Sequence, residues 1–213
     1  MKIKVCGLKY PDNIRAIEAL EPKYMGFIFY GRSPRFAGDL DADALAAISP
    51  EIIKTGVFVN ERAEEIEALV DKYDFKAVQL HGNESPEFVE RFKDRVQVLK
   101  AFGVNEDFDF EQLKDYVGKV DHFLFDTKTD AHGGSGKTFN WDILNKYTLE
   151  VPFFLSGGLS LDNLDQINKI KHPQFYGVDL NSKFETAPGL KDIEKLKQAF
   201  SLIKQDNTHE VRS

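Results

Sequence analysis

A short apolar run followed by a turn and an amphipathic stretch recurs along almost the whole chain, and this repeat most constrains the fold. The apolar runs are rich in Val, Ile and Phe, as expected for strands that are buried on both faces. They lie at Ile3–Cys6, Met25–Phe29, Thr55–Val59, Ala77–Leu80, Val96–Ala101, His122–Asp126, Pro152–Ser156 and Phe175–Leu180. The segments with helical spacing lie near 11–21, 41–49, 61–73, 85–93, 107–118, 139–147, 160–171 and 190–204.

Strands that alternate with helices form βαβ units and a parallel sheet. Eight such units in 213 residues are close to the lower size of a (β/α)8 barrel, roughly 200 residues. We therefore expect an α/β fold, a TIM barrel that forms one domain over residues 1–205, with a polar tail at 206–213. A doubly wound open sheet is the competing architecture.

Composition narrows the range of partners. The formal net charge is −7, and an acidic surface repels phosphate backbones, which argues against nucleic acid as a partner. A single cysteine excludes an intrachain disulfide and zinc sites built on several cysteines, and the five histidines show no metal-ligand spacing. The N-terminus lacks an apolar signal region, and no apolar run approaches about 18 residues, so we expect a cytoplasmic protein without a membrane partner.

Chemistry in such a barrel belongs at the carboxyl ends of the strands, and Cys6 ends the first one. Alternation along the strand places Lys4 and Cys6 toward the interior, while Ile3 and Val5 face the helices. An ammonium group beside the thiol would lower the thiol pKa and favour the thiolate that a general base needs. The simpler interpretation is a small buried hydrophobic residue.

Asp126 ends the sixth apolar run, and Asp179 lies inside the eighth. Burying a carboxylate in so apolar a strand costs free energy, so we expect it to be paired with a cation or to take part in the chemistry. Partial withdrawal from water raises the pKa of a carboxyl group, which suits Asp126 as a general acid. The alternative for Asp126 is a solvated aspartate that caps the following turn.

Polar side chains also follow the second and fourth strands. Arg35, in the loop after the second strand, has a guanidinium group that can bind a carboxylate or phosphate through two hydrogen bonds. Gln79 and His81 share one face at the end of the fourth strand. The structural alternative for Arg35 is a solvated loop charge. For Gln79 and His81 it is a polar side chain whose hydrogen bonds are satisfied within the protein.

Two loops predict a phosphate site. Gly157 and Gly158 directly follow the seventh strand, where glycines allow backbone N–H groups to approach a phosphate at a helix N-terminus. Asn181 and Ser182 follow the eighth strand, and Lys183 adds a cation. The loops after strands seven and eight are the recurrent phosphate site of these barrels.

The segment Ala131–Thr138 resembles a nucleotide-binding P-loop in which Ala131 replaces the first glycine. A true P-loop turns directly from strand to helix, whereas five residues separate Asp126 from His132. We therefore interpret this segment as a mobile glycine-rich lid and not as a nucleotide site.

Several short blocks, in order and with suitable gaps, resemble the phosphoribosylanthranilate isomerase family of tryptophan biosynthesis over residues 2–200. The blocks are Lys4–Leu8, Gly26–Phe29 with Ser33–Arg35, Gly56–Asn60, Gln79–Glu84, Phe125–Thr127, Gly133–Trp141 and Ser156–Leu159. This resemblance implies an Amadori rearrangement of a phosphorylated small molecule, without metal or cofactor. It assigns Asp126 as the general acid and Cys6 as the general base.

The resemblance also implies the binding residues. Arg35 would bind the anthranilate carboxylate, and the loops of Gly157, Gly158 and Ser182 would bind the phosphate. We expect Gln79, His81, Asp179 and Asn181 to complete the substrate site, in a protein that is a monomer or a homodimer.

The chain departs from the family pattern at Lys183, where the family has a glycine. A lysine does not readily adopt positive φ if that loop requires it. Two other functions remain open at this point. One is a barrel that binds a sugar phosphate without turnover. The other is a different phosphosugar enzyme, for which Lys100, interpreted as the end of the fifth strand, is the nearest candidate for a Schiff-base lysine.

Overall fold

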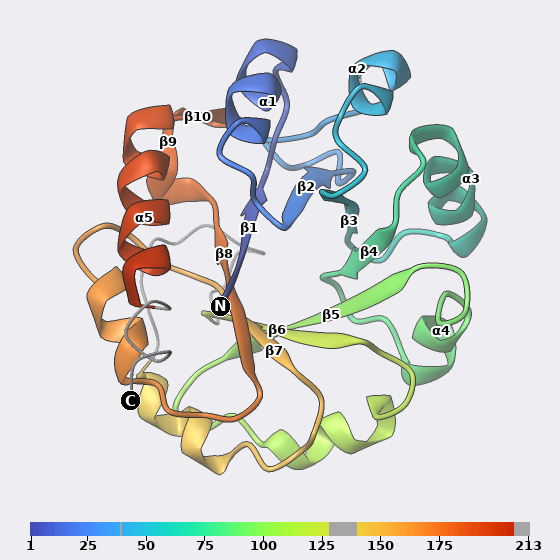
Figure 1. The fold of residues 1–213 in the computed structure, drawn as a ribbon. Coiled ribbons are helices and arrows are strands. Elements are labelled where there is room, and N and C mark those ends of the chain that lie inside the picture. The colour runs from blue at the N-terminus through green and yellow to red at the C-terminus, as the bar shows by residue number, and fades with distance from the viewer. Residues whose placement is uncertain (39, 128–139, 207–213) are drawn as a thin grey trace.

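The computed structural model describes residues 1–38, 40–127 and 140–206. Eight parallel strands close into a barrel in sequence order, and β8 pairs with β1. The helices lie around this ring (Figure 1). The strands are β1 (Lys2–Cys6), β2 (Tyr24–Ile28), β3 (Ile53–Phe58), β4 (Ala77–Leu80), β5 (Gln97–Val104), β6 (His122–Thr127), β7 (Phe153–Leu155) and β8 (Phe175–Leu180). The expected TIM barrel is therefore confirmed, and the open sheet is wrong.

The connections contain α-helices in the first half of the chain and at its end. These are α1 (Pro11–Glu18), α2 (Ala42–Ala46), α3 (Ala63–Tyr73), α4 (Pro86–Glu90) and α5 (Ile193–Asp206). In the second half, the segments expected to be α-helices form the short 3-10 helices η1 (Phe110–Tyr116), η2 (Trp141–Lys146) and η3 (Leu164–Lys169), and a further turn, η4 (Ser182–Phe184), follows β8.

The difference has a physical reason in the spacing of the apolar residues. Each of the three segments presents apolar side chains at every third position, which a helix of three residues per turn aligns on one face. In η1 these are Phe110, Leu113 and Tyr116, all of which pack against the core. Trp141, Leu144 and Tyr147 repeat the spacing at η2, as do Leu164, Ile167 and Ile170 at η3.

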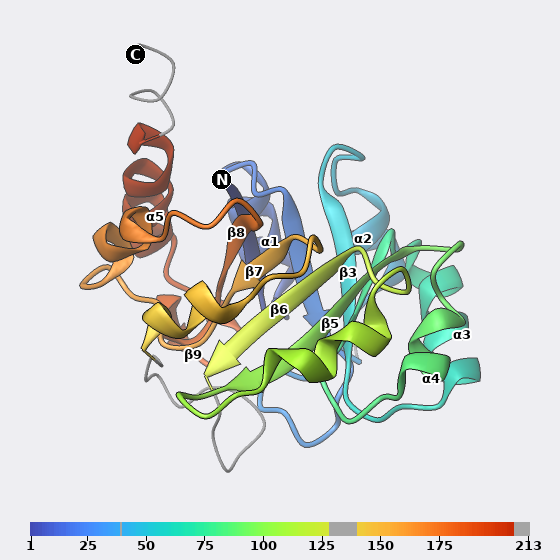
Figure 2. The same cartoon turned by 90° about the horizontal axis from the view of Figure 1, so that it is seen from below.

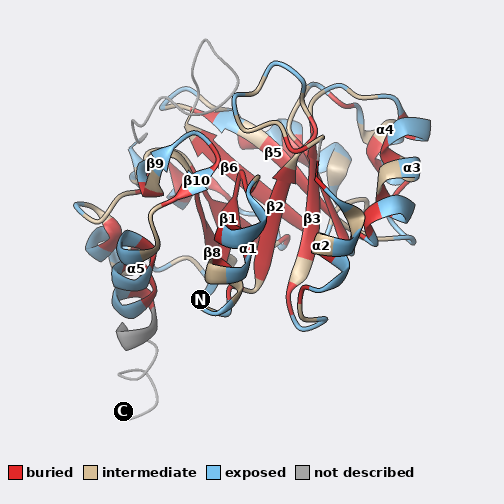
Figure 3. Cartoon of the chain, turned by 90° about the horizontal axis from the view of Figure 1, so that it is seen from above, coloured by how far each residue is buried: buried red, intermediate tan, exposed pale blue. Residues whose placement is uncertain are grey.

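The main core lies between the barrel and its outer helices. In Figure 3 the strands are buried along most of their length, while the outer faces of the helices are exposed. A smaller cluster inside the barrel contains Tyr24, Ala77, Leu99, Ala101, Leu124 and Phe154. Alternation along each strand separates these two cores, because successive side chains point to opposite faces.

The residues between η4 and α5 form a small antiparallel hairpin, where a helix was expected from residue 190. It consists of β9 (Glu185–Ala187) and β10 (Leu190–Lys191), and Lys191 pairs with Glu185 in its register. In Figure 2 β9 lies near the end of the barrel to which the arrow of β6 points. The hairpin therefore lies beside the carboxyl ends of the strands.

Within the described residues, no helix is both long enough and apolar enough to cross a membrane. The polar tail expected at 206–213 falls, from residue 207 onward, outside the described residues, and α5 continues to Asp206.

Candidate active site

A cavity of about 490 Å³ opens at the carboxyl ends of the strands. All the site residues predicted from the sequence line it, although they come from six different strands or the loops after them. They are Cys6, Arg35, Gln79, His81, Asp126, Gly157, Gly158, Asp179, Asn181 and Ser182. The rule that barrel chemistry is found at strand ends thus selected residues that share one cavity.

Cys6 is the last residue of β1 and is buried. Gly26 is its partner on β2, and a Cβ atom at that position would lie 2.7 Å from the Cys6 Sγ atom. The glycine therefore provides the space that the thiol occupies. Two residues earlier, the buried Lys4 forms an ion pair with Asp179, with Nζ 2.9 Å from Oδ2.

The pKa of the Cys6 thiol is raised, contrary to the sequence-based expectation. Burial is the main cause, since it disfavours the thiolate, and the Asp179 carboxylate acts in the same direction. The Lys4 ammonium opposes both effects. Burial also disfavours the charged form of Lys4, but Asp179 outweighs it, so the pKa of Lys4 is raised and the ammonium persists.

Asp126 lies near the end of β6, where Oδ1 accepts a hydrogen bond of 2.8 Å from the backbone N–H of Thr127. Its Oδ2 atom is 3.4 Å from Nε2 of His81. On the other side of that ring, the Gln79 amide nitrogen is 2.8 Å from Nδ1. With Gln79 as the donor to Nδ1, the ring proton is on Nε2 and faces Asp126.

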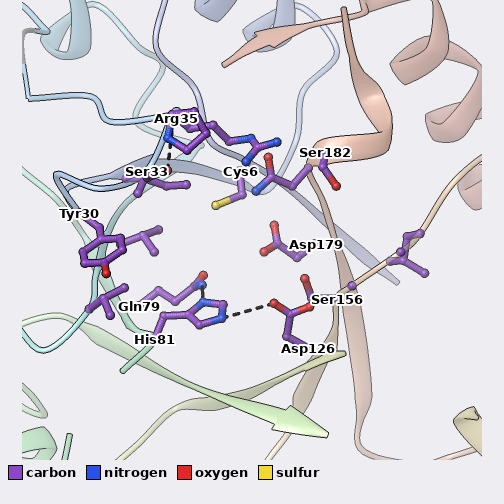
Figure 4. A pocket seen from close by; sticks show the side chains of 18 of the residues that line it. Cys6, Tyr30, Ser33, Arg35, Gln79, His81, Asp126, Ser156, Asp179 and Ser182 are labelled. Atoms are coloured by element: carbon purple, nitrogen blue, oxygen red, sulfur yellow. Dashed lines mark hydrogen bonds and ion pairs between the residues drawn. The ribbon is translucent and has the colours of Figure 1, made fainter. Parts of the chain in front are cut away.

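The thiol and the carboxyl group lie on opposite sides of the cavity (Figure 4). Cys6 is near Arg35 and Ser182, Asp126 is beside His81, and Asp179 lies between the two sides. A small molecule bound in this cavity can thus contact a thiol and a carboxyl group at the same time, which is the arrangement that paired acid and base catalysis requires.

The glycine loop after β7 packs directly against Asp126. Gly157 has φ of +82° and Gly158 of +68°. A Cβ atom at position 157 would lie 2.4 Å from Oδ1 of Asp126 and 2.5 Å from the Thr127 nitrogen. The expected helix does not begin directly after this loop, since η3 starts only at Leu164. A phosphate here would therefore be bound by loop amides and not by a helix N-terminus.

The second loop predicted to bind phosphate follows β8. Asn181 and Ser182 line the cavity, whereas Lys183 is exposed and is not part of its lining. Positive φ occurs at Glu21, Asn60 and Asp74 among the described residues other than glycine, so the loop does not impose it on Lys183. The strain expected at this departure from the family pattern is absent.

Arg35 lies in the cavity wall, but its guanidinium group is already paired. Glu185 accepts from Nε at 2.9 and 3.0 Å and from Nη2 at 2.8 Å. Lys191 donates to Glu185 at 2.6 Å and to the Oδ1 atom of Asn181 at 2.7 Å. The sequence analysis missed Glu185 and Lys191, although the Pro188-Gly189 turn signal between them could have indicated a hairpin.

Lys100 does not reach the cavity. It lies in the middle of β5 and not at its end, and because Leu99 and Ala101 face the interior, Lys100 points outward. Its Nζ atom is 3.0 Å from Glu84 and donates to the carbonyl oxygens of Leu80, Gly82 and Ala101. The structure therefore contradicts Lys100 as a candidate Schiff-base lysine.

Across the part of the chain that the structure describes, no three His, Cys, Asp or Glu side chains form a group suited to a metal ion. The segment interpreted as a glycine-rich lid, Ala131–Thr138, lies outside the described residues.

Comparison with known proteins identifies the family. The family model of N-(5'-phosphoribosyl)anthranilate isomerase matches residues 3–201. The chain belongs to the phosphoribosylanthranilate isomerase family. A curated N-(5'-phosphoribosyl)anthranilate isomerase from Parabacteroides distasonis is 47% identical over 206 residues, which cover 95% of this chain and 93% of the relative.

Solved structures of phosphoribosylanthranilate isomerases share the fold. The enzyme from Thermotoga maritima superposes with a TM-score of 0.82 at 31% identity, over 96% of this chain and 99% of the other. Another isomerase structure, a complex with reduced 1-(o-carboxyphenylamino)-1-deoxyribulose 5-phosphate, has a TM-score of 0.79 at 27% identity, with the same coverage of both chains.

Proposed function

We propose that this chain converts N-(5'-phosphoribosyl)anthranilate to 1-(2-carboxyphenylamino)-1-deoxyribulose 5-phosphate, a step of tryptophan biosynthesis. The observation that carries the proposal is the placement of Cys6 and Asp126 on opposite sides of one cavity, in a member of this isomerase family. The relative solved with the reduced, phosphorylated product analogue supports a small-molecule substrate of this kind.

Asp126 acts as the general acid in this proposal. It donates a proton to the ribose ring oxygen while the bond from that oxygen to C1' breaks. The lone pair of the anthranilate nitrogen forms the C1'–N double bond of a Schiff base. His81, 3.4 Å from Oδ2, and the Thr127 N–H orient the carboxyl group for this transfer.

Cys6 acts as the general base. Its thiolate removes the proton from C2', and the electron pair of that bond forms the C1'–C2' double bond while the nitrogen regains its lone pair. The resulting enolamine takes a proton at C1' and loses one from the C2' hydroxyl group, which gives the ketone. Substrate and product are isomers, so no oxidant or reductant is needed.

The charged groups of the substrate are assigned to different binding groups of the cavity. We assign the anthranilate carboxylate to Arg35, and the phosphate to the loop amides at Gly157 and Gly158 together with Asn181 and Ser182. Gln79 and Asp179 also line the cavity. The proposal uses no cofactor or metal, and it holds for a monomer or a homodimer.

The charges of substrate and product keep these molecules from crossing membranes unaided. We therefore place the reaction in the cytoplasm.

The test is the loss of anthranilate fluorescence when purified protein is added to freshly generated substrate, with a chelator present. We expect rapid loss with the wild type. Asp126→Asn and Cys6→Ser should each lower kcat by about 100-fold or more, because an amide cannot act as an acid and a hydroxyl is a much weaker base than a thiolate.

Both variants should still bind the reduced product analogue, which calorimetry measures independently of turnover. A folded wild type that binds the analogue but leaves the fluorescence unchanged would contradict the isomerase. A variant with near-normal turnover would contradict the role of its residue only.

A further inference from the structure

The hairpin β9–β10 places two charged side chains behind the cavity wall. Glu185 and Lys191 are register partners across it. Gly189, with φ of +84°, forms the turn and donates its N–H to Oε1 of Glu185 at 3.1 Å. Exposed fractions are 5% for the Glu185 side chain and 0% for that of Lys191. Removing two charged groups from water is costly unless their attraction and their hydrogen bonds offset the lost hydration.

Glu185 occupies one edge of the Arg35 guanidinium group. Its carboxylate accepts from Nε and Nη2, which form the side edge of that planar fork. The other edge, formed by Nη1 and the second N–H of Nη2, has the geometry to bind another carboxylate through two hydrogen bonds. Arg35 is thus oriented by one carboxylate, and within the described part of the chain the second edge makes no hydrogen bond.

This arrangement raises a problem of charge. A carboxylate within 3 Å of Arg35 cancels the positive charge that an anionic ligand needs. Lys191 offsets it, since its Nζ atom is 2.6 Å from Oε1 of Glu185. Arg35, Glu185 and Lys191, which we name the Arg35 triad, together carry a net charge of +1.

The surroundings of Lys191 support its charged state. Its Nζ atom donates to two oxygen acceptors, on Glu185 and Asn181. Burial lowers the pKa of Lys191, and Glu185 opposes that effect only in part, so the charged state is supported by these two short hydrogen bonds and not by the direction of the pKa. Burial likewise tends to raise the pKa of Glu185, but Arg35 and Lys191 outweigh it, so that pKa is lowered and the carboxylate is ionised.

We propose that Lys191 is a specificity-determining residue that keeps the Arg35 triad cationic, so that the cavity selects a substrate bearing a carboxylate on its aromatic group. Lys191 and Glu185 are positioning residues, since both act through Arg35 and neither lines the cavity. The inference rests on the proposed function, because that function supplies the anthranilate carboxylate.

The test compares two ligands by calorimetry. One is reduced 1-(o-carboxyphenylamino)-1-deoxyribulose 5-phosphate, and the other is the same compound without the carboxyl group. Their affinity ratio isolates the carboxylate, because both carry the phosphate. In the wild type we expect a preference of about tenfold or more for the carboxylate form, as a partly buried charge-assisted pair provides.

The preference should follow the net charge of the Arg35 triad. Lys191→Met brings that charge to zero, and we expect the preference to fall below about threefold. The double variant Glu185→Gln/Lys191→Met restores +1, and the preference should recover to within about threefold of the wild type. A purely structural role predicts the opposite, with the double variant no better than the single one.

The matched control is Lys197→Met, which removes a lysine paired with Glu194 at 2.7 Å on the exposed side of α5. It should leave the preference unchanged. An unchanged preference in Lys191→Met, or a double variant that fails to recover, would overturn the inference. If Lys191→Met does not fold, Glu185→Gln takes its place. That variant raises the net charge to +2, and a preference below that of the wild type would overturn the inference.

Failure of the inference and failure of the proposed function give different results. Turnover of N-(5'-phosphoribosyl)anthranilate by the wild type, with no preference for the carboxylate ligand, would overturn this inference and leave the isomerase in place. A wild type without turnover would contradict the isomerase, whereas the ligand preference of the Arg35 triad is still measured by binding.

Discussion

The Nζ atom of Lys4 lies 2.9 Å from Oδ2 of Asp179 inside the barrel, and Cys6 is the next inward-facing residue along β1. The ion pair has two opposite effects on the thiol. The ammonium favours the thiolate, whereas the carboxylate and burial disfavour it, and the pKa of Cys6 is raised as a result. The base proposed here thus needs a higher pH than an ordinary thiol to become ionised.

A first prediction concerns the pH dependence of kcat/KM. In the proposed mechanism Cys6 acts as a thiolate, so kcat/KM should rise with pH as the thiol ionises, and the raised pKa places that rise above the range of an ordinary thiol. Lys4→Met removes the ammonium that favours the thiolate, so the rise should move to still higher pH. Initial rates across a pH series measure it.

The control for this series is Lys54→Met, which removes another buried strand lysine, one that contacts Leu45 and Asp74 away from the cavity. Its pH profile should match the wild type. A profile that is the same in Lys4→Met and in the wild type would mean that the rate does not depend on the ionisation of Cys6.

A second prediction concerns Arg35. Arg35→Ala should raise KM by about 10-fold or more, with a smaller effect on kcat, because the proposed function assigns the guanidinium group to the carboxylate and not to the reacting carbons. Steady-state kinetics with saturating and limiting substrate separate the two constants. An unchanged KM would contradict the assignment of the anthranilate carboxylate to Arg35.

The inward placement of Lys4 and Cys6 was predictable, because strand alternation is a local rule. Lys100 was misjudged for a related reason. Its strand extends to Val104, three residues past the last apolar residue that the pattern indicated, so Lys100 is not at a strand end. Alternation with Leu99 then determines that it points outward.

Long-range contacts explain what the sequence analysis missed. Glu185 contacts Arg35 across 150 residues of chain, and β9 and β10 are only three and two residues long. Strands this short show no periodicity. The raised pKa of Cys6 is likewise a balance of burial and the charges of Lys4, Asp179 and Lys191, which spacing along β1 alone does not reveal.

A third prediction concerns stability. Lys100 and Glu84 are both buried, with Nζ 3.0 Å from Oε2. Lys100→Met leaves the Glu84 carboxylate buried without its cation, so the free energy of unfolding should fall by about 3–5 kcal/mol. Denaturant titration measures this loss. Turnover per folded molecule should stay close to that of the wild type, and loss of turnover in folded protein would reopen a catalytic role for Lys100.

The last prediction separates backbone strain from a contact with the proposed acid. Gly157 and Gly118 have nearly the same φ, +82° and +80°. A Cβ atom at 118 meets nothing within 4 Å, whereas one at 157 meets Asp126 and Thr127. Each Gly→Ala change should cost about 1–2 kcal/mol of stability from the left-handed backbone alone.

Only Gly157→Ala should also lower kcat, by about 10-fold or more, because the added methyl group displaces the Asp126 carboxyl group from the position that donates its proton. Thermal unfolding and initial rates of the two variants give both quantities. Gly118→Ala should retain wild-type kcat. Equal kcat values in the two variants would show that Gly157 is needed only for the left-handed backbone conformation of the loop and does not position Asp126.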